Sequence, residues 1–211
     1  MRAKQVNELI PKICEYENIV CRGIHFHRKT QNTSEWSLKY ELEQTIKPEI
    51  LQKIHMVNIG GGLPDVYKNS RPEIINQIMS KILELKKWLN QQKISTVIEP
   101  GRYLAAHSIE LETSIKNIYE NTIIVDCSVY NACMDAFVAN IRLLVKGETD
   151  KSQGEGYTIK GMTPCSMDIF RYKVYLKNPV KGDKIIFENA GAYNFWTNFC
   201  NLKKIPTVIT K

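Results

Sequence analysis

The clearest indication of the fold is the stretch of residues 94–102, which reads ISTVIEPGR. Its first five residues form a short apolar run rich in β-branched side chains, which is typical of a buried strand. A carboxylate, Glu99, and a cation, Arg102, follow directly. Enzymes built on parallel α/β barrels carry their active-site residues at this end of their strands. The stretch therefore predicts a barrel strand that runs into a functional loop.

Two further strand-like runs precede it, at residues 19–26 and 55–59. A helical pattern precedes each run. Residues 4–16 precede the first run, and residues 36–54, interrupted at Pro48, precede the second. A third helical pattern starts after Arg71, where a proline is tolerated in the first turn. The alternation of strand and helix predicts a parallel sheet. One face of the last helix carries an apolar series at helical spacing: Ile75, Ile78, Met79, Ile82, Leu85 and Leu89.

The pattern changes after Arg102, where strand-like segments follow one another and helical periodicity is weak apart from residues 131–139. We therefore expect two domains, with residues 1–105 as an α/β domain built on a parallel sheet and residues 106–211 as a mostly β domain. Residues 147–156 read as an exposed loop. The strand-like segments of the second domain are 107–118, 121–127, 157–160, 171–177, 184–188 and 206–210.

Composition narrows the possible functions. The chain has 211 residues, a formal charge of +7 and a pI near 9.0, but its lysines are scattered and no basic stripe interleaves with aromatic residues. We expect a solvated lysine-rich surface and no nucleic-acid partner. No apolar run approaches the roughly 18 residues that span a membrane, and the amino terminus reads as an amphipathic helix with no signal peptide. No membrane partner is expected.

The six cysteines show neither a CxxC pair nor a Cys/His spacing suited to a metal. No metal site is expected, and free thiols indicate a reducing, cytoplasmic location. Five of the cysteines read as small buried side chains. Cys165 is set apart by its motif, residues 161–168, which reads GMTPCSMD.

A short motif follows each of the three strand-like runs. Each motif can be interpreted as part of a functional site or as an ordinary structural feature. Gly60, Gly61 and Gly62 could let backbone N–H groups approach a phosphate, or could form an ordinary turn. Glu99 and Arg102 could be a functional pair or a surface ion pair. His27 lies two residues after His25, so both point to the same face of a strand, where a histidine is often simply packed or hydrogen-bonded.

Taken in order, these motifs together with residues 161–168 and 190–193 (AGAY) strongly resemble the fold type III pyridoxal-phosphate decarboxylases that act on ornithine, diaminopimelate and arginine. The resemblance covers essentially the whole chain. It implies an α/β plus β fold: the carboxyl-terminal portion of a (β/α)8 alanine-racemase-like barrel, followed by a mostly β domain. It also implies pyridoxal 5′-phosphate as the cofactor and an amino acid, a small-molecule substrate, as the reactant.

The resemblance assigns the cofactor-binding residues one by one. His27 would stack on the cofactor ring. Glu99 would face the pyridine nitrogen, keeping it protonated so that the ring is a strong electron sink. The residues that it implies for the phosphate are Thr30, Gly60, Gly61, Gly62, Arg102 and Tyr193.

The catalytic residues implied by the resemblance are His27, Cys165 and Asp168. In the family, a cysteine in this segment reaches across a dimer interface and handles the proton returned to the substrate carbon, and an acidic neighbour grips the distal amine of a diamino substrate. This chain departs from the usual pattern, because Pro164 stands in the cysteine's place and Cys165 in that of the acid. Either the loop shifts by one residue and Cys165 serves as the acid, or the substrate differs; a buried, inert cysteine is the structural alternative.

The family lysine that holds the cofactor lies upstream of the part that this chain matches, and we expect the chain to lack it. Three parallel strands would also leave two open edges, which predicts a homodimer or a complementary amino-terminal chain as partner. Two functions remain open: a decarboxylase part that works with the missing half, or a non-catalytic remnant or regulatory homologue that associates with intact decarboxylase subunits. Arg28 and Lys29, beside the pocket, together with the lost acid, suggest a substrate whose distal group is neutral or acidic.

Overall fold

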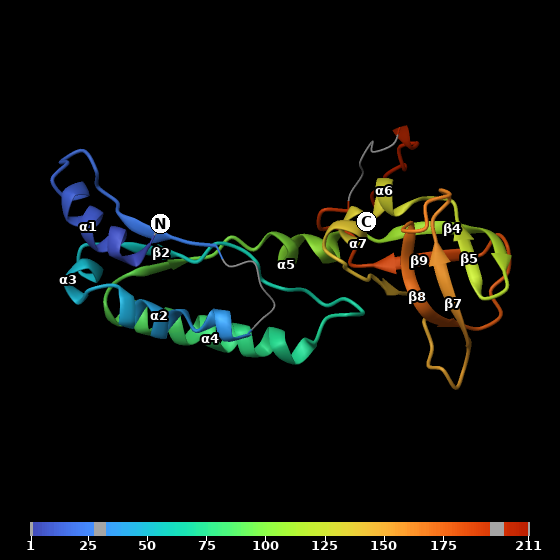
Figure 1. Cartoon of the computed structure of the whole chain (residues 1–211), viewed down its shortest axis with the longest axis horizontal. Helices are drawn as coiled ribbons and strands as arrows, with labels where there is room; N and C mark the ends of the chain where they lie inside the picture. Colours follow the sequence, from blue (N-terminus) through green and yellow to red (C-terminus); the bar gives the residue numbers. More distant parts are fainter. Residues whose placement is uncertain (1, 28–32, 195–200, 211) are drawn as a thin grey trace. The chain divides into compact units, whose positions relative to one another are not determined.

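The computed structural model describes residues 2–27, 33–194 and 201–210 (Figure 1). The chain divides into two compact units. The first contains residues 1–64 and 71–101, and the second contains residues 65–70 and 102–211. Each unit has its own hydrophobic core.

The first unit is built on a three-stranded parallel sheet in the order β1-β2-β3. The strands are β1 (Gly23–His25), β2 (Met56–Asn58) and β3 (Ser95–Val97). Their register aligns Ile24 with Val57 and Val57 with Thr96. Because the strands are parallel and in register, the segments that follow them start at the same edge of the sheet.

Helices cover this sheet. Figure 1 shows α2 (Leu38–Thr45) and α4 (Pro72–Gln91) side by side beneath the strands. Pro72 is the first residue of α4, and the buried residues of the helix, Ile78, Ile82, Leu85 and Leu89, follow the predicted spacing. They form a core with Trp36, Val57 and Ile59, all nearly inaccessible to solvent. The unit also contains α1 (Ala3–Ile13), the 3₁₀ helix η1 (Thr33–Trp36) and α3 (Pro48–Leu51).

Two sequence expectations for this unit need correction. The strand expected over residues 19–26 is restricted to Gly23–His25, because only those three residues pair with β2. The helix expected over residues 36–54 is two helices, α2 and α3, separated at Pro48. Proline fits the first turn of a helix but cannot continue one, so α3 starts there.

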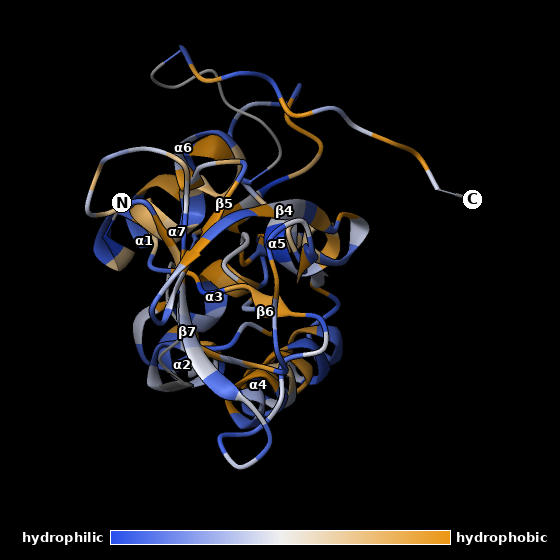
Figure 2. Cartoon of the chain, turned by 90° about the vertical axis from the view of Figure 1, so that its right-hand side faces the viewer, coloured by the Kyte–Doolittle hydropathy of each residue, from blue (hydrophilic) through white to orange (hydrophobic). Residues whose placement is uncertain are grey.

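The second unit is a six-stranded sheet in the order β6-β9-β4-β5-β7-β8, with every neighbouring pair antiparallel except β5 and β7. Figure 2 shows hydrophobic residues along β4 and β5, where buried residues alternate with more exposed ones. Ile123, Val125, Ile159, Val174 and Phe187 are almost completely buried in its core. The strands are β4 (Leu111–Tyr119), β5 (Thr122–Val125), β6 (Leu144–Val145), β7 (Glu155–Lys160), β8 (Ile169–Leu176) and β9 (Lys184–Glu188).

The described residues of this part of the chain also form short helices: α5 (Gly101–Ala105), the 3₁₀ helix η2 (Ala106–Ser108), α6 (Val129–Ala132) and α7 (Met134–Val138). The segment 65–70 joins the unit through hydrogen bonds: Asn189 donates to the carbonyl of Val66, and the N–H of Lys68 donates to the carbonyl of Arg142. Lys68 also pairs with the nearly buried Glu148, which forms two hydrogen bonds with Arg171.

The β character after Arg102 was predicted correctly, with three differences. The strand expected over residues 107–118 begins only at Leu111, because residues 106–108 form the 3₁₀ helix η2. Residues 206–210 form no strand, although they read as one; Pro206 has no N–H to give to a sheet, and Val208 and Ile209 are exposed. The two-residue strand β6 was too short to show in the sequence pattern. Within the described ranges, no helix is both long and apolar enough to cross a membrane.

Candidate functional site

Glu99 lies just beyond the end of β3 and is fixed by the neighbouring strand. The side-chain amide of Asn58, at the end of β2, donates to Glu99 Oε1 over 2.7 Å. The backbone N–H of Glu99 donates to the carbonyl of Gly60 over 2.8 Å. Its carboxylate is nevertheless half exposed. The arrangement presents an oriented, accessible carboxylate at the carboxyl edge of the sheet.

The glycine string fits closely between the two neighbouring strand ends. Gly60 has φ +68°, a conformation that favours glycine, and a Cβ there would lie 2.8 Å from the carbonyl oxygen of Phe26. A Cβ on Gly61 would lie 2.5 Å from the carbonyl oxygen of Glu99. Side chains are therefore excluded from this turn, and the backbone itself forms the surface between the strands. Gly62 also has a positive φ, +85°.

His27 follows β1 and reaches the same turn. The N–H of Gly61 donates to His27 Nδ1 over 3.3 Å, and the N–H of Gly60 donates to the side-chain oxygen of Asn58 over 2.9 Å. His25 and His27 are both exposed, as expected for residues two apart on one strand face. His25 Nε2 lies 3.8 Å from Glu99 Oε2. The ends of all three strands thus contribute polar groups to one cluster.

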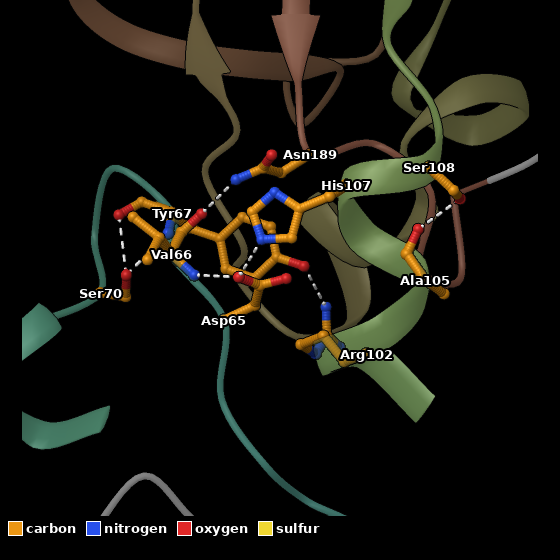
Figure 3. Close-up of polar contacts among 9 residues, drawn as sticks. All are labelled: Asp65, Val66, Tyr67, Ser70, Arg102, Ala105, His107, Ser108 and Asn189. Carbon is orange, nitrogen blue, oxygen red and sulfur yellow. Dashed lines mark hydrogen bonds and ion pairs between the residues drawn. The ribbon is translucent and has the colours of Figure 1, made fainter. Parts of the chain in front are cut away.

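The second unit contains a separate cluster around Arg102 (Figure 3). The guanidinium pairs with the nearly buried Asp135 and donates to the hydroxyl of Tyr67 over 3.1 Å. Burial alone would lower the pKa of Arg102, but the bonds to Asp135 and Tyr67 outweigh it and raise that pKa, so the group stays charged. Burial in turn raises the pKa of the Tyr67 phenol. The guanidinium carbon also lies 5.0 Å from the ring centre of Tyr193, which joins two residues predicted to contact the phosphate.

Asp65 anchors the same region. It is almost fully buried, accepts from the N–H of Val66, and lies 3.0 Å from His107 Nε2 (Figure 3). The imidazole of His107 is largely exposed. The pair fixes the segment that follows the glycine string against η2.

Cys165 lies in the loop between β7 and β8, where the hydroxyl of Tyr130 donates to its sulfur over 2.9 Å. This hydrogen bond and the N–H of Met167 lower the pKa of the Cys165 thiol. Two other cysteines behave oppositely, because burial raises the pKa of Cys127 and of Cys133 to about 12. The expectation that five cysteines are buried is wrong for Cys21, which is exposed, and for Cys14, which is half-buried; Cys200 lies outside the described residues.

The carboxylate of Asp168 points into the protein. It accepts from the N–H of Val129 over 2.9 Å and from both the N–H and the hydroxyl of Thr163, over 3.1 and 2.6 Å. Asp168 is 1% exposed, and a Cβ on Gly161 would collide with its carboxylate. Its contacts hold the 161–168 loop in shape and leave no face of the carboxylate open to solvent.

The predicted residues therefore form three groups. The group in the first unit consists of His27, Gly60, Gly61 and Glu99. In the second unit, Arg102 contacts Tyr193, and Cys165 and Asp168 share one loop. Thr30 lies outside the described residues. Sequence analysis missed five polar residues of these groups, and only Asn58, a polar residue at the end of a strand, carried a signal that could have revealed it. The other four have no local pattern of their own: Asp65, Tyr67, Tyr130 and Asp135.

A parallel α/β sheet with a histidine, a glycine turn and a carboxylate at successive strand ends, followed by a β unit, is the arrangement that the sequence resemblance to pyridoxal-dependent decarboxylases implies. Comparison with known proteins agrees. Residues 2–106 match the family described as pyridoxal-dependent decarboxylase, pyridoxal binding domain. A diaminopimelate decarboxylase of Buchnera aphidicola subsp. Acyrthosiphon pisum (strain APS) is 26% identical over an alignment of 234 residues that covers 97% of this chain. Residues 2–106 are thus similar to the pyridoxal binding domain of pyridoxal-dependent decarboxylases, and nearly the whole chain is similar to one diaminopimelate decarboxylase.

Solved structures show the same fold. The lysine/ornithine decarboxylase from Vibrio vulnificus, complexed with cadaverine, has a TM-score of 0.68 at 22% identity over 96% of this chain. The arginine decarboxylase of Paramecium bursaria Chlorella virus has a TM-score of 0.67 at 19% identity over 95% of this chain. The match spans 54% of the Buchnera relative and 57% of each of these structures, so the chain corresponds to about half of such a protein. The predicted fold class, part of a barrel followed by a β domain, is confirmed.

Proposed function

We propose that this chain is the carboxyl-terminal part of a pyridoxal-phosphate-dependent amino-acid decarboxylase. The observation that carries the proposal is the cluster at the strand ends of the first unit, where His27, the glycine turn and Glu99 are held together by hydrogen bonds. The division into a barrel part, residues 1–105, and a β domain, residues 106–211, belongs to the same proposal.

The residues present fit pyridoxal phosphate. A Cβ is excluded from Gly60 and Gly61, so this turn offers backbone alone. A phosphate bound there would take over the N–H groups that now donate to Asn58 and His27. Glu99 is accessible and oriented by Asn58, which suits a partner for a pyridinium nitrogen. His27 would hold the ring, Gly60–Gly62, Thr30, Arg102 and Tyr193 would hold the phosphate, and the bound cofactor would supply an electron sink.

The chain's own residues would orient the cofactor and move one proton. The Glu99 carboxylate would stabilise positive charge on the ring nitrogen, because opposite charges in contact favour the charged form of each. Cys165 would deliver a proton to the substrate carbon. The lowered pKa of its thiol makes it a stronger acid for this step. Asp168 would act indirectly, by shaping the loop that carries Cys165.

The remaining strands and the cofactor lysine would come from an amino-terminal half, on the same polypeptide or on another. In the described part of the first unit, β1 and β3 each pair only with β2, so each presents an edge that a neighbouring barrel strand could extend. A homodimer and a cytoplasmic location are part of the proposal. The cysteines among the described residues are all free thiols, which is consistent with that location.

The substrate would carry a neutral or acidic distal group. Asp168 is the only acidic residue of the 161–168 loop, and its carboxylate is buried and occupied by three hydrogen bonds. The side chains that the loop exposes include Met162 and Met167. A substrate with a distal ammonium would meet no carboxylate there, whereas a charge-assisted partner is worth roughly 2–5 kcal/mol in a desolvated site.

The test is cofactor binding by the chain purified together with an amino-terminal half that contains the family lysine. Titration with pyridoxal phosphate, followed by visible absorbance, should reach one cofactor per complex. Glu99→Gln should change the absorbance spectrum and weaken binding, whereas Glu73→Gln, an exposed residue in the first turn of α4, should leave both unchanged. A complex that forms but takes up no cofactor would favour the alternative, a non-catalytic homologue.

A further inference from the structure

Tyr130 and Cys165 form a hydrogen-bonded pair that connects α6 to the 161–168 loop. The phenol is the donor, over 2.9 Å, and the sulfur is the acceptor. A donor of this kind binds a thiolate more strongly than a thiol, because hydrogen bonds to charged acceptors are the stronger ones. The pair is thus arranged to stabilise the sulfur when it loses its proton.

Both partners are held in place by their surroundings. The ring of Tyr130 is buried and packs edge-on against Phe137, with ring centres 5.6 Å apart. Its backbone N–H donates to the hydroxyl of Ser128 at the start of α6. Asp168 ties the two elements together: its carboxylate accepts from Val129, the neighbour of Tyr130, and its N–H donates to the carbonyl of Cys165 over 3.1 Å. The hydrogen bond therefore depends on a fixed geometry rather than on a chance contact of surface side chains.

The other groups that face the sulfur act in opposing directions. Tyr130 has the largest influence and lowers the pKa of Cys165, and the N–H groups of Met167 and Asp168 lower it further. Partial burial and the negative charge of the Asp168 carboxylate raise that pKa. The net direction is downward, so Tyr130 is the group whose removal should matter most.

We propose that Tyr130 is a positioning residue that keeps Cys165 ready to donate its proton. The inference rests on the proposed function, in which Cys165 protonates the substrate carbon after carbon dioxide leaves. In that step the proton moves from sulfur to carbon. The electron pair of the S–H bond stays on sulfur, and the pair left on carbon by the departing carboxylate forms the new C–H bond. The Tyr130 hydroxyl meets the charge that develops on sulfur and so lowers the barrier.

The test measures the thiol itself and requires no turnover. The purified protein is alkylated with iodoacetamide across a range of pH, and peptide mass spectrometry follows Cys165 and the exposed Cys21 separately. In Tyr130→Phe, which keeps the ring and its contact with Phe137, the midpoint for Cys165 should move to higher pH. Its alkylation rate near neutral pH should fall roughly three- to tenfold, because the thiolate fraction falls. Tyr119→Phe, at an exposed position on β4, is the matched control and should change neither thiol.

The outcomes are distinct. A raised midpoint for Cys165 with an unchanged midpoint for Cys21 supports the proposal. An unchanged midpoint for Cys165 in Tyr130→Phe overturns it, as does an equal shift of both thiols, which would report a general loss of structure. If the complemented protein proves to bind no cofactor while the Cys165 shift is observed, the proposed function fails and the role of Tyr130 toward the thiol stands. If the protein decarboxylates but Cys165 does not respond, only the present inference fails.

Discussion

Replacing Gly60 by alanine should destabilise the first unit far more than the same change at Gly147 destabilises the second. Both glycines have a positive φ, +68° at Gly60 and +76° at Gly147, so both changes cost about 1–2 kcal/mol for a left-handed alanine. At Gly147 the added Cβ meets nothing within 4 Å. At Gly60 it would lie 2.8 Å from the carbonyl oxygen of Phe26 and 3.0 Å from His27 Cα, which are backbone atoms of β1's continuation and cannot rotate away.

The extra clash should add about 1–3 kcal/mol, the usual cost of overpacking. We therefore expect a loss of about 2–5 kcal/mol for Gly60→Ala and of about 1–2 kcal/mol for Gly147→Ala. Hydrogen exchange with mass spectrometry can measure each change locally. The amides that report on the turn are Ile59, bonded to Val97, and Glu99, bonded to Gly60; for the control, Glu148, bonded to Val145, serves the same purpose. Equal losses at the two sites would refute the idea that close approach of the strands requires a glycine at position 60.

Two further predictions rest on individual contacts, and a third concerns the attachment of the cofactor. Asp168→Ala should destabilise the second unit by about 2–4 kcal/mol, because it leaves the buried N–H of Val129 and the polar groups of Thr163 without their acceptor. Asp168→Asn should cost less, and thermal unfolding would measure both variants. An Asp168→Ala variant with unchanged stability would contradict the role of this carboxylate in holding the loop. Burial alone would raise the pKa of Asp126, but hydrogen bonds from Thr113 and Ser114 lower it. The ionised carboxylate therefore stabilises the fold above the unfolded-state pKa, and this stabilisation is lost as the pH falls through the folded-state pKa. Asp126→Asn should flatten the fall of the melting temperature below about pH 4, whereas Asp150→Asn, at an exposed position, should not. Borohydride treatment of the isolated chain with pyridoxal phosphate, followed by peptide mapping, should label no single lysine stoichiometrically, and one fully labelled lysine would show that the chain supplies its own attachment point.

The sequence was sufficient to predict the cluster in the first unit. His27, the glycine string and Glu99 each follow a strand, and parallel strands in register bring their carboxyl ends to one edge of the sheet. Local pattern and topology together therefore predicted their proximity. Asn58 could have been added by the same argument, since it is the last residue of β2.

Other features depend on contacts that local pattern does not encode. Arg102 and Tyr193 are far apart in the sequence, and their stacking follows from how the second unit folds. The motif of residues 161–168 indicated an acidic residue at a functional position, but only the path of the loop shows that Asp168 turns inward. Residues 206–210 have β-branched side chains suited to a strand, but strand formation also needs a neighbour to pair with, and none of the described strands extends to them.

The most direct test of the central claim is release of carbon dioxide by the chain complemented with an amino-terminal half and loaded with pyridoxal phosphate. A panel of amino acids with neutral, acidic and cationic distal groups should be compared, with Arg28→Gly alongside. We predict carbon dioxide and the matching amine in equal amounts, with neutral or acidic substrates preferred over ornithine and lysine. Strong turnover of ornithine, unchanged by Arg28→Gly, would refute the substrate preference alone. A complex with full cofactor occupancy that releases no carbon dioxide from any amino acid would contradict the claim that this chain is part of a decarboxylase.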